Sequence, residues 1–191
     1  MNESALGARL ATSARTQELR AALREVCRRL KNGDASTLLV WVIAQRLACG
    51  HRPLRCDPMH GGSRVDLPES AAPTVTRWIE RIYAEGIRGV ISLLHAKEVA
   101  HYRMLDLGAT DLHAAYSAHG LTVVHIPWDD PAHRAHDEHS FHVELARVAS
   151  EALKAYEQLP KPVLLHCSAG IDRSSPIATH LFECDQNGPA I

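Results

Sequence analysis

The chain has 191 residues, of which 46% are hydrophobic and 23% are charged, and its formal net charge is −1. Such a length and composition are typical of one soluble globular domain, and the near-zero charge excludes a general attraction to nucleic acid or anionic membranes. No apolar run approaches the ~20 residues that span a bilayer, and residues 1–4 lack a secretory signal, so we expect a cytoplasmic protein without a membrane span.

The first predicted element is an amphipathic helix over residues 16–31, which places Leu19 and Leu23 on one face and ends at Gly33. Six basic residues lie along it: Arg15, Arg20, Arg24, Arg28, Arg29 and Lys31. They suit either a solvated face or a surface for an acidic partner or membrane. We interpret them as a solvated face.

Beyond residue 36, apolar runs that predict strands alternate with helical patterns. The predicted strands are residues 38–43, 46–49, 90–94, 121–126 and 163–166, and their runs of Val, Leu and Ile indicate full burial. The predicted helices are residues 73–86, 112–120, 141–159 and 176–183, with a loop from residue 184 onward. This order predicts an α/β fold with a central, mostly parallel sheet and helices on both faces.

The most informative segment is residues 166–174, His-Cys-Ser-Ala-Gly-Ile-Asp-Arg-Ser, which follows the last predicted strand. A loop between a strand and a helix can turn its backbone N–H groups inward and bind a tetrahedral oxyanion. The residues of this ring are Ser168, Ala169, Gly170, Ile171, Asp172 and Arg173. Cys167 is expected at its floor, where amide dipoles and the Arg173 guanidinium favour the nucleophilic thiolate.

Three residues of this segment each have an additional role. Arg173 has a planar fork that holds two phosphate oxygens at once, which lysine lacks. Gly170 allows a positive φ, and Ser174 places a hydroxyl where it can donate to the sulfur of Cys167. The alternative interpretation is a chance Cys/Arg pair in a turn, with Cys167 an inert buried thiol.

An acidic segment bounded by prolines follows the strand predicted at residues 121–126. It reads Ile-Pro-Trp-Asp-Asp-Pro over residues 126–131. A carboxylic acid on a loop that faces a phosphate can protonate the departing oxygen, and either Asp130 or Asp129 can supply that proton. The alternative is that these aspartates only cap the next helix.

Together these residues resemble the His-Cys-x5-Arg-Ser/Thr signature of the cysteine-dependent protein tyrosine phosphatase superfamily. Residues 126–130 are similar to the Ile-Pro-x-x-Asp pattern of its dual-specificity members, which favours Asp130 as the acid, and residues 41–53 resemble the opening hairpin of the bacterial type. The resemblance spans residues 41–182. It implies a phosphatase-like α/β fold, with a catalytic domain over residues 36–191 and a helical extension over residues 1–35.

The resemblance also implies an activity. We expect hydrolysis of phosphomonoesters through a phosphocysteine, without cofactor or metal, with Cys167, Arg173, Asp130 and Ser174 as catalytic residues. Expected substrates are phosphorylated proteins or small phosphate esters, with phosphotyrosine first and phosphoserine and phosphothreonine admitted by a shallow pocket. Residues 52–64 are predicted to form a long loop that borders this pocket.

Two alternatives to this function stay open. An aspartate in the position of Asp172 also occurs in relatives that accept phosphoinositides, so a lipid or other non-protein phosphate is one alternative. The other is an inactive phosphate-binding interaction module, because only residues 175–191 follow the signature where relatives usually continue into further helices. Either the N-terminal helix covers the surface concerned, or the chain is a truncated product of reduced stability.

The cysteines and histidines carry secondary predictions. The five cysteines are Cys27, Cys49, Cys56, Cys167 and Cys184, an odd number without metal-ligand spacing, which suits a reducing compartment and one reactive thiol. Cys49 or Cys56 can pair with Cys167, but we favour small core or loop roles for both.

Four histidines recur in steps of three residues: His133, His136, His139 and His142. Positions three residues apart drift around the axis of a helix, so these side chains do not share one face. We therefore expect solvent-facing histidines and no metal site.

Overall fold

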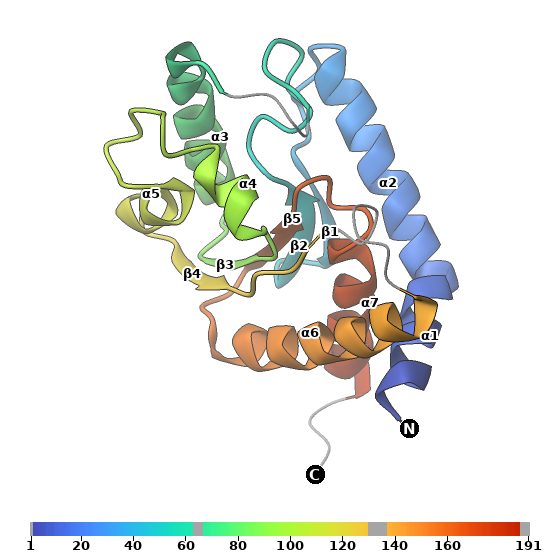
Figure 1. Cartoon of the computed structure of the whole chain (residues 1–191). Helices are drawn as coiled ribbons and strands as arrows, with labels where there is room; N and C mark the ends of the chain where they lie inside the picture. Colours follow the sequence, from blue (N-terminus) through green and yellow to red (C-terminus); the bar gives the residue numbers. More distant parts are fainter. Residues whose placement is uncertain (1, 63–66, 130–136, 188–191) are drawn as a thin grey trace.

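The computed structural model describes residues 2–62, 67–129 and 137–187 (Figure 1). Its strands are β1 (Leu39–Ile43), β2 (Leu47–His51), β3 (Gly89–Ser92), β4 (Thr122–His125) and β5 (Val163–Cys167). Its helices are α1 (Glu3–Thr12), α2 (Ala14–Lys31), α3 (Ala72–Ala84), α4 (Ala96–Ala100), α5 (Leu112–Ala118), α6 (Glu138–Gln158) and α7 (Ser174–Asn187), with a short 3-10 helix, η1 (Glu69–Ala71), before α3.

The five strands form one mixed sheet in the order β1-β2-β5-β3-β4. β1 and β2 are an antiparallel hairpin, and β2, β5, β3 and β4 are parallel to one another. Gln45 takes a φ of 55° in the hairpin turn. The predicted α/β architecture with a mostly parallel sheet is therefore confirmed.

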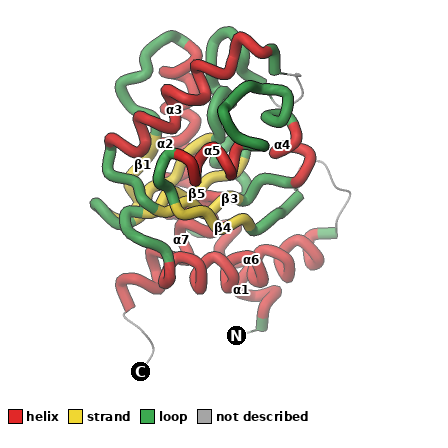
Figure 2. Tube along the Cα trace, turned by 90° about the vertical axis from the view of Figure 1, so that its left-hand side faces the viewer, coloured by secondary structure: helices red, strands yellow, loops and turns green. Residues whose placement is uncertain are grey.

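Helices cover both faces of the sheet, as Figure 2 shows. Side chains of a strand point alternately to its two faces, so Val163 and Leu165 of β5 join the core under α6 and α7, while Leu164 joins the core under α3 and α5. The prediction of full burial holds for β2, β3 and β5. It is wrong for β1 and β4, which are half-exposed because they are the edge strands.

The segment before residue 35 forms two helices, where the sequence predicted one. α1 crosses α6 and α7, and α2 runs along α7 and the β1 edge (Figure 1). A Cβ on Gly7 would lie 2.0 Å from the carbonyl oxygen of His142 in α6, so the two backbones meet there. Leu10 and Leu23 are fully buried in the same core as β5, and α1 and α2 therefore cover α7.

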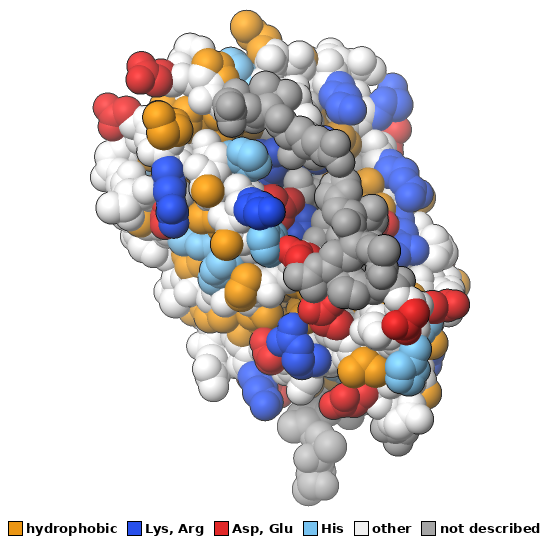
Figure 3. All heavy atoms as spheres, in the orientation of Figure 1, with side chains coloured by type: hydrophobic (Ala, Val, Ile, Leu, Met, Phe, Trp, Pro, Cys, Tyr) orange, Lys and Arg blue, Asp and Glu red, His pale blue; other side chains and the backbone are white. Residues whose placement is uncertain are grey.

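The basic residues of α2 divide into two groups. Lys and Arg side chains line the α2 edge of the face in Figure 3. Arg24 and Arg28 of this helix are exposed, as predicted. Arg15 and Arg20 are only partly solvated. The Arg15 guanidinium lies 3.3 Å from the centre of the Phe182 ring, and Arg20 Nε donates to the carbonyl oxygen of Ile171 at 3.4 Å.

The last helix is longer than predicted. α7 extends to Asn187, so residues 184–187 are helical and not a loop. No proline or glycine interrupts them, and Asp185 pairs with Arg46 at 2.8 Å, which holds the last turn on the hairpin. Within the described ranges, no helix combines the length and apolar character that crossing a membrane requires.

Candidate active site

Four segments meet at the carboxyl ends of the parallel strands. The 167–173 loop follows β5, residues 52–62 follow β2, residues 93–98 follow β3, and residues 126–129 follow β4. Open α/β sheets bind ligands at this edge. The fold therefore brings the 167–173 loop to the same edge as the described part of the acidic segment.

Cys167 ends β5 and is only 2% exposed. The Gly170 amide donates to its Sγ at 3.2 Å, so the loop curves over the sulfur. Four neighbouring amides donate to no acceptor in the part of the chain that the structure describes, namely those of Ser168, Ala169, Ile171 and Asp172. Successive N–H groups without protein acceptors form an anion-binding concavity.

Gly170 makes the tight curve possible. Its φ is 72°, as predicted for a glycine turn. A Cβ at this position would lie 2.7 Å from the carbonyl oxygen of Gly50 in β2, so a side chain would push the loop away from the sheet. Ser175 Oγ also donates to the Gly170 carbonyl at 2.9 Å. These contacts fix the loop from both sides.

Arg173 is buried, with 1% of its side chain exposed, and its orientation is set by an ion pair. Nη1 and Nη2 each donate at 2.7 Å to one carboxylate oxygen of Glu98. Nη1 also donates to the carbonyl oxygens of Leu93 at 3.0 Å and Trp128 at 2.8 Å. The guanidinium thus joins the segments that follow β3, β4 and β5.

Sequence reasoning missed Glu98, which lies in α4. Burial disfavours its charged form, but the hydrogen bonds and charge of Arg173 outweigh this and hold the pKa of Glu98 below its ordinary value. The side chain also accepts from the backbone N–H of His95, which completes a capping box at the start of α4. The sequence signal for this capping box was weak, because histidine is an unusual N-cap residue and α4 is only about one turn long.

The acidic segment is described as far as Asp129. Trp128 is 1% exposed and stacks on Phe141 of α6, which anchors the segment to the core. The Asp129 carboxylate pairs with His95 Nε2 at 2.7 Å. Asp130, the predicted acid, lies outside the described residues, so its role stays a prediction.

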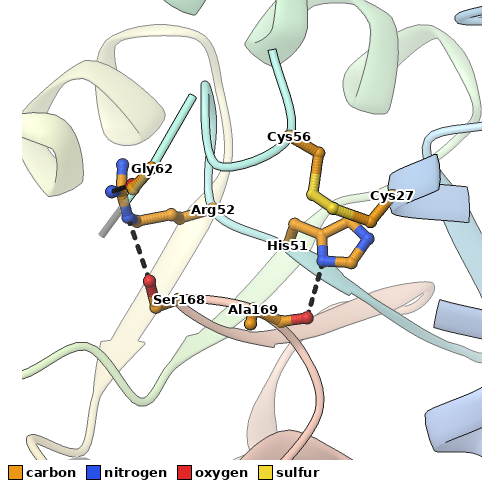
Figure 4. The surroundings of a disulfide bond; sticks show 7 residues. All are labelled: Cys27, His51, Arg52, Cys56, Gly62, Ser168 and Ala169. Atoms are coloured by element: carbon orange, nitrogen blue, oxygen red, sulfur yellow. Dashed lines mark hydrogen bonds between the residues drawn. A yellow bond between two sulfur atoms is a disulfide. The ribbon is translucent and has the colours of Figure 1, made fainter. Parts of the chain in front are cut away.

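A second arginine that sequence reasoning missed supports the loop from β2. Arg52 is 4% exposed, and its Nε donates to Ser168 Oγ at 3.2 Å (Figure 4). Its amide donates to the Ser168 carbonyl at 3.1 Å. Its other nitrogens donate to Tyr102 Oη and to the Gly62 carbonyl, both at 2.7 Å. The 52–62 segment therefore borders the candidate site, as predicted for the longer loop.

Two buried histidines flank Cys167. His166 precedes Cys167, and burial lowers its pKa to about 3. His51 ends β2, its Nδ1 lies 2.7 Å from the Ala169 carbonyl (Figure 4), and burial lowers its pKa to about 4. Both rings are neutral at pH 7, so neither adds positive charge beside Cys167.

The remaining predicted site residues have different surroundings. Ile171 is half-buried and Asp172 is exposed. Ser174 is buried, and its Oγ has no well-formed hydrogen bond to a described residue, with the Cys49 thiol close by. The predicted bond from Ser174 to Cys167 Sγ is therefore absent among the described contacts.

Two predictions on cysteine and histidine need correction. Cys56 is bonded to Cys27 in a disulfide, and is neither a free core thiol nor a partner of Cys167. Cys49, Cys167 and Cys184 are free, and Cys49 is fully buried as a small core residue. His142 is 9% exposed, so it is not solvent-facing, and its backbone lies against Gly7 of α1. His139 is exposed, and His133 and His136 lie outside the described residues.

Comparison of the chain with protein-family models found no match, and comparison with curated proteins found none either. The functional interpretation therefore depends on the residues and geometry described above.

Proposed function

We propose that the protein is a cysteine-dependent phosphatase that hydrolyses phosphomonoesters through a phosphocysteine. The observation that carries the proposal is the curve of the 167–173 loop over Cys167, with four amides that have no acceptor among the described residues and a buried, oriented Arg173 at its end. The N–H groups of such a loop and guanidinium can donate hydrogen bonds to the three equatorial oxygens of a phosphoryl group during its transfer.

The reaction has two steps. The Cys167 thiolate attacks phosphorus, the bond from phosphorus to the ester oxygen breaks, and the carboxylic acid of Asp130 protonates that oxygen. The Asp130 carboxylate then takes a proton from water, which attacks phosphorus and releases phosphate and the thiolate. Arg173 and the loop amides hold the phosphoryl oxygens in both steps.

Residues around the loop prepare this geometry. Glu98 fixes the plane of the Arg173 guanidinium, and Trp128 binds the acidic segment to the same guanidinium through its carbonyl. Arg52 holds Ser168 from the opposite side. A site held in place before substrate binds loses less entropy on reaching the transition state. We propose phosphotyrosine in proteins as the principal substrate, with phosphoserine and phosphothreonine accepted.

Hydrolysis of an aryl phosphate tests the proposal. The 191-residue chain should release phosphate in the presence of a chelator, because no step uses a metal. Cys167→Ser should abolish turnover, whereas Cys184→Ser, which changes a half-buried thiol in α7, should retain it. Wild-type turnover by Cys167→Ser would show that the sulfur is not the nucleophile. Binding of phosphate without turnover in the wild type would instead favour an inactive binding module.

A further inference from the structure

A cluster of metal-ligating side chains lies behind the 167–173 loop, outside the candidate active site. Its members are Cys27 from α2, His51 from the end of β2 and Cys56 from the 52–62 segment (Figure 4). The two sulfurs and an imidazole nitrogen all lie within 4.8 Å of one another. Cys27 of α2 thus lies beside two residues, His51 and Cys56, that are close together in sequence but distant from it.

His51 is oriented as metal-ligating histidines are. Its Nδ1 lies 2.7 Å from the Ala169 carbonyl, and since that oxygen only accepts, Nδ1 carries the hydrogen. Nε2 therefore carries the lone pair. His51 is 2% exposed, and its buried Nε2 has no well-formed hydrogen bond in the described part of the chain, with the backbone of Leu23 in α2 close by. Ligating histidines almost always donate their other N–H to a carbonyl or carboxylate in this way.

The two cysteines have an oxidised and a reduced form. Cys27 and Cys56 form a disulfide here, with Cα atoms 5.2 Å apart. A reducing compartment keeps such a pair as thiols, and close cysteine pairs in reduced proteins commonly serve as metal ligands. Reduction therefore leaves two thiols beside the lone pair of His51 Nε2.

We propose that the reduced protein binds one Zn²⁺ through Cys27, His51 and Cys56, and that the disulfide is the oxidised, metal-free form of the same site. Thiolate sulfur and imidazole nitrogen are the ligands that zinc prefers. Two thiolates balance the charge of the ion. A cavity of about 410 Å³, which His51 and Cys56 help to line, lies beside the proposed site, and a water molecule from it would be the fourth ligand.

The site requires a small movement of the sulfurs. Two sulfurs bound at about 2.3 Å to a tetrahedral ion lie roughly 3.8 Å apart. Cys27 is half-buried and Cys56 lies in a segment without strand pairing, so their side chains can separate without disturbing the sheet. A metal ion on Nε2 also makes Nδ1–H a stronger donor to Ala169, which ties the site to the 167–173 loop.

The exchange between the two forms balances with a thiol reductant. Two reductant thiols supply two electrons and two protons, so the Cys27–Cys56 bond breaks and a reductant disulfide forms. Zn²⁺ then displaces the two cysteine protons, which pass to water. An oxidant that accepts two electrons restores the disulfide and releases the ion.

Metal titration of the full chain tests the proposal. The protein is reduced with a phosphine, which does not compete as a thiol ligand, and Zn²⁺ is titrated against a chromophoric chelator. One equivalent should bind to the reduced protein and none to the oxidised protein. Co²⁺ in place of Zn²⁺ should give thiolate-to-metal charge-transfer bands. Failure of reduced wild-type protein to bind stoichiometric Zn²⁺ would overturn the proposal.

Variants assign the ligands. Cys27→Ser and His51→Gln should each weaken Zn²⁺ binding by about 100-fold or more, since even loss of a supporting contact costs 10- to 100-fold. Cys184→Ser should bind as the wild type does, although Cys184 lies 3.7 Å from His180 Nε2. Wild-type affinity in Cys27→Ser would contradict the proposed site. Should a variant unfold, alkylation of reduced wild-type protein decides: Zn²⁺ must protect Cys27 and Cys56, and equal labelling with and without Zn²⁺ would refute the site.

Discussion

The buried ion pair between Arg173 and Glu98 shows how single residues control the candidate site. Removing one partner of a buried pair leaves an uncompensated charge, so each side chain depends on the other. The pair is bidentate, which fixes the plane of the guanidinium as well as its position. In the proposed phosphatase, Glu98 is thus a positioning residue that acts on the substrate through Arg173.

Glu98→Gln should lower kcat for an aryl phosphate by about 10- to 100-fold, because a guanidinium without its charged partner is held less firmly. Inhibition by inorganic phosphate should weaken as well, since Arg173 binds the same oxygens in both complexes. Glu25→Gln is the matched control, because it breaks the exposed pair with Arg28 on α2. An unchanged kcat in Glu98→Gln would show that Arg173 is positioned without it.

Buried histidines predict how stability depends on pH. Burial lowers the pKa of His113 to about 4 and that of His166 to about 3. Between about pH 6.5 and 4 the unfolded chain binds protons at these positions and the folded chain does not, so the free energy of unfolding falls as the pH falls.

Urea unfolding at a series of pH values between 7 and 4 measures this dependence. His113→Gln should reduce its slope, because it removes one of the buried, uncharged imidazoles. A free energy of unfolding that does not change over this range in the wild type would contradict the burial of uncharged histidines.

Some residues of the candidate site could be predicted from the sequence, and others could not. Cys167, Gly170 and Arg173 stand in one short segment, where type and spacing indicate an anion-binding loop. Glu98 and Arg52 come from other segments and reach the loop only through the order of the strands. Their charges alone did not distinguish them from the exposed acidic and basic residues.

At the scale of elements, the acidic segment after β4 carries the proton donor in our proposal. Asp130→Asn should lower turnover of an alkyl or tyrosyl phosphate by about 100-fold, and less for a very acidic phenol that leaves without a proton. Asp129→Asn is the matched control and should have a small effect. A larger, leaving-group-dependent loss in Asp129→Asn would assign the acid to that residue and its pair with His95.

The crossing of α1 over α6 depends on Gly7. Alanine is the better helix former by about 1 kcal/mol, so propensity alone predicts that Gly7→Ala stabilises the protein. We expect destabilisation by about 1–3 kcal/mol instead, because the added Cβ would overlap the His142 carbonyl. Denaturant unfolding measures the difference, with Ala5→Gly on the exposed side of α1 as the control. Stabilisation by Gly7→Ala would mean that the backbones do not meet there.

The predicted element boundaries were close to the observed ones where hydrophobic periodicity and bounding Gly or Pro residues were clear, as for β5 and α3. The predictions were wrong where tertiary contacts determine the structure. The exposure of β4 depends on its position at the sheet edge, and the length of α7 depends on contacts of its last turn with the hairpin. α1 was missed because its apolar residues are few and its small residues serve the crossing with α6.

At the scale of the whole molecule, alternating strands and helices sufficed to predict an α/β fold with a mostly parallel sheet, because each strand run indicated burial. The disulfide of Cys27 and Cys56 was not predictable, since 29 residues separate the two cysteines and only the packing of α2 beside the 52–62 segment brings them together. The same packing explains why the sequence showed no ligand spacing for the zinc site that we propose.

The covalent intermediate is the central claim. The wild-type protein should be mixed with an aryl phosphate, quenched in acid while product still forms, and digested for mass analysis of the peptide that contains Cys167. Our account predicts a phosphoryl group on Cys167, and none on the corresponding peptide of Cys167→Ser under the same conditions. Phenol release by the wild type with Cys167 unmodified throughout, together with undiminished turnover by Cys167→Ser, would contradict it.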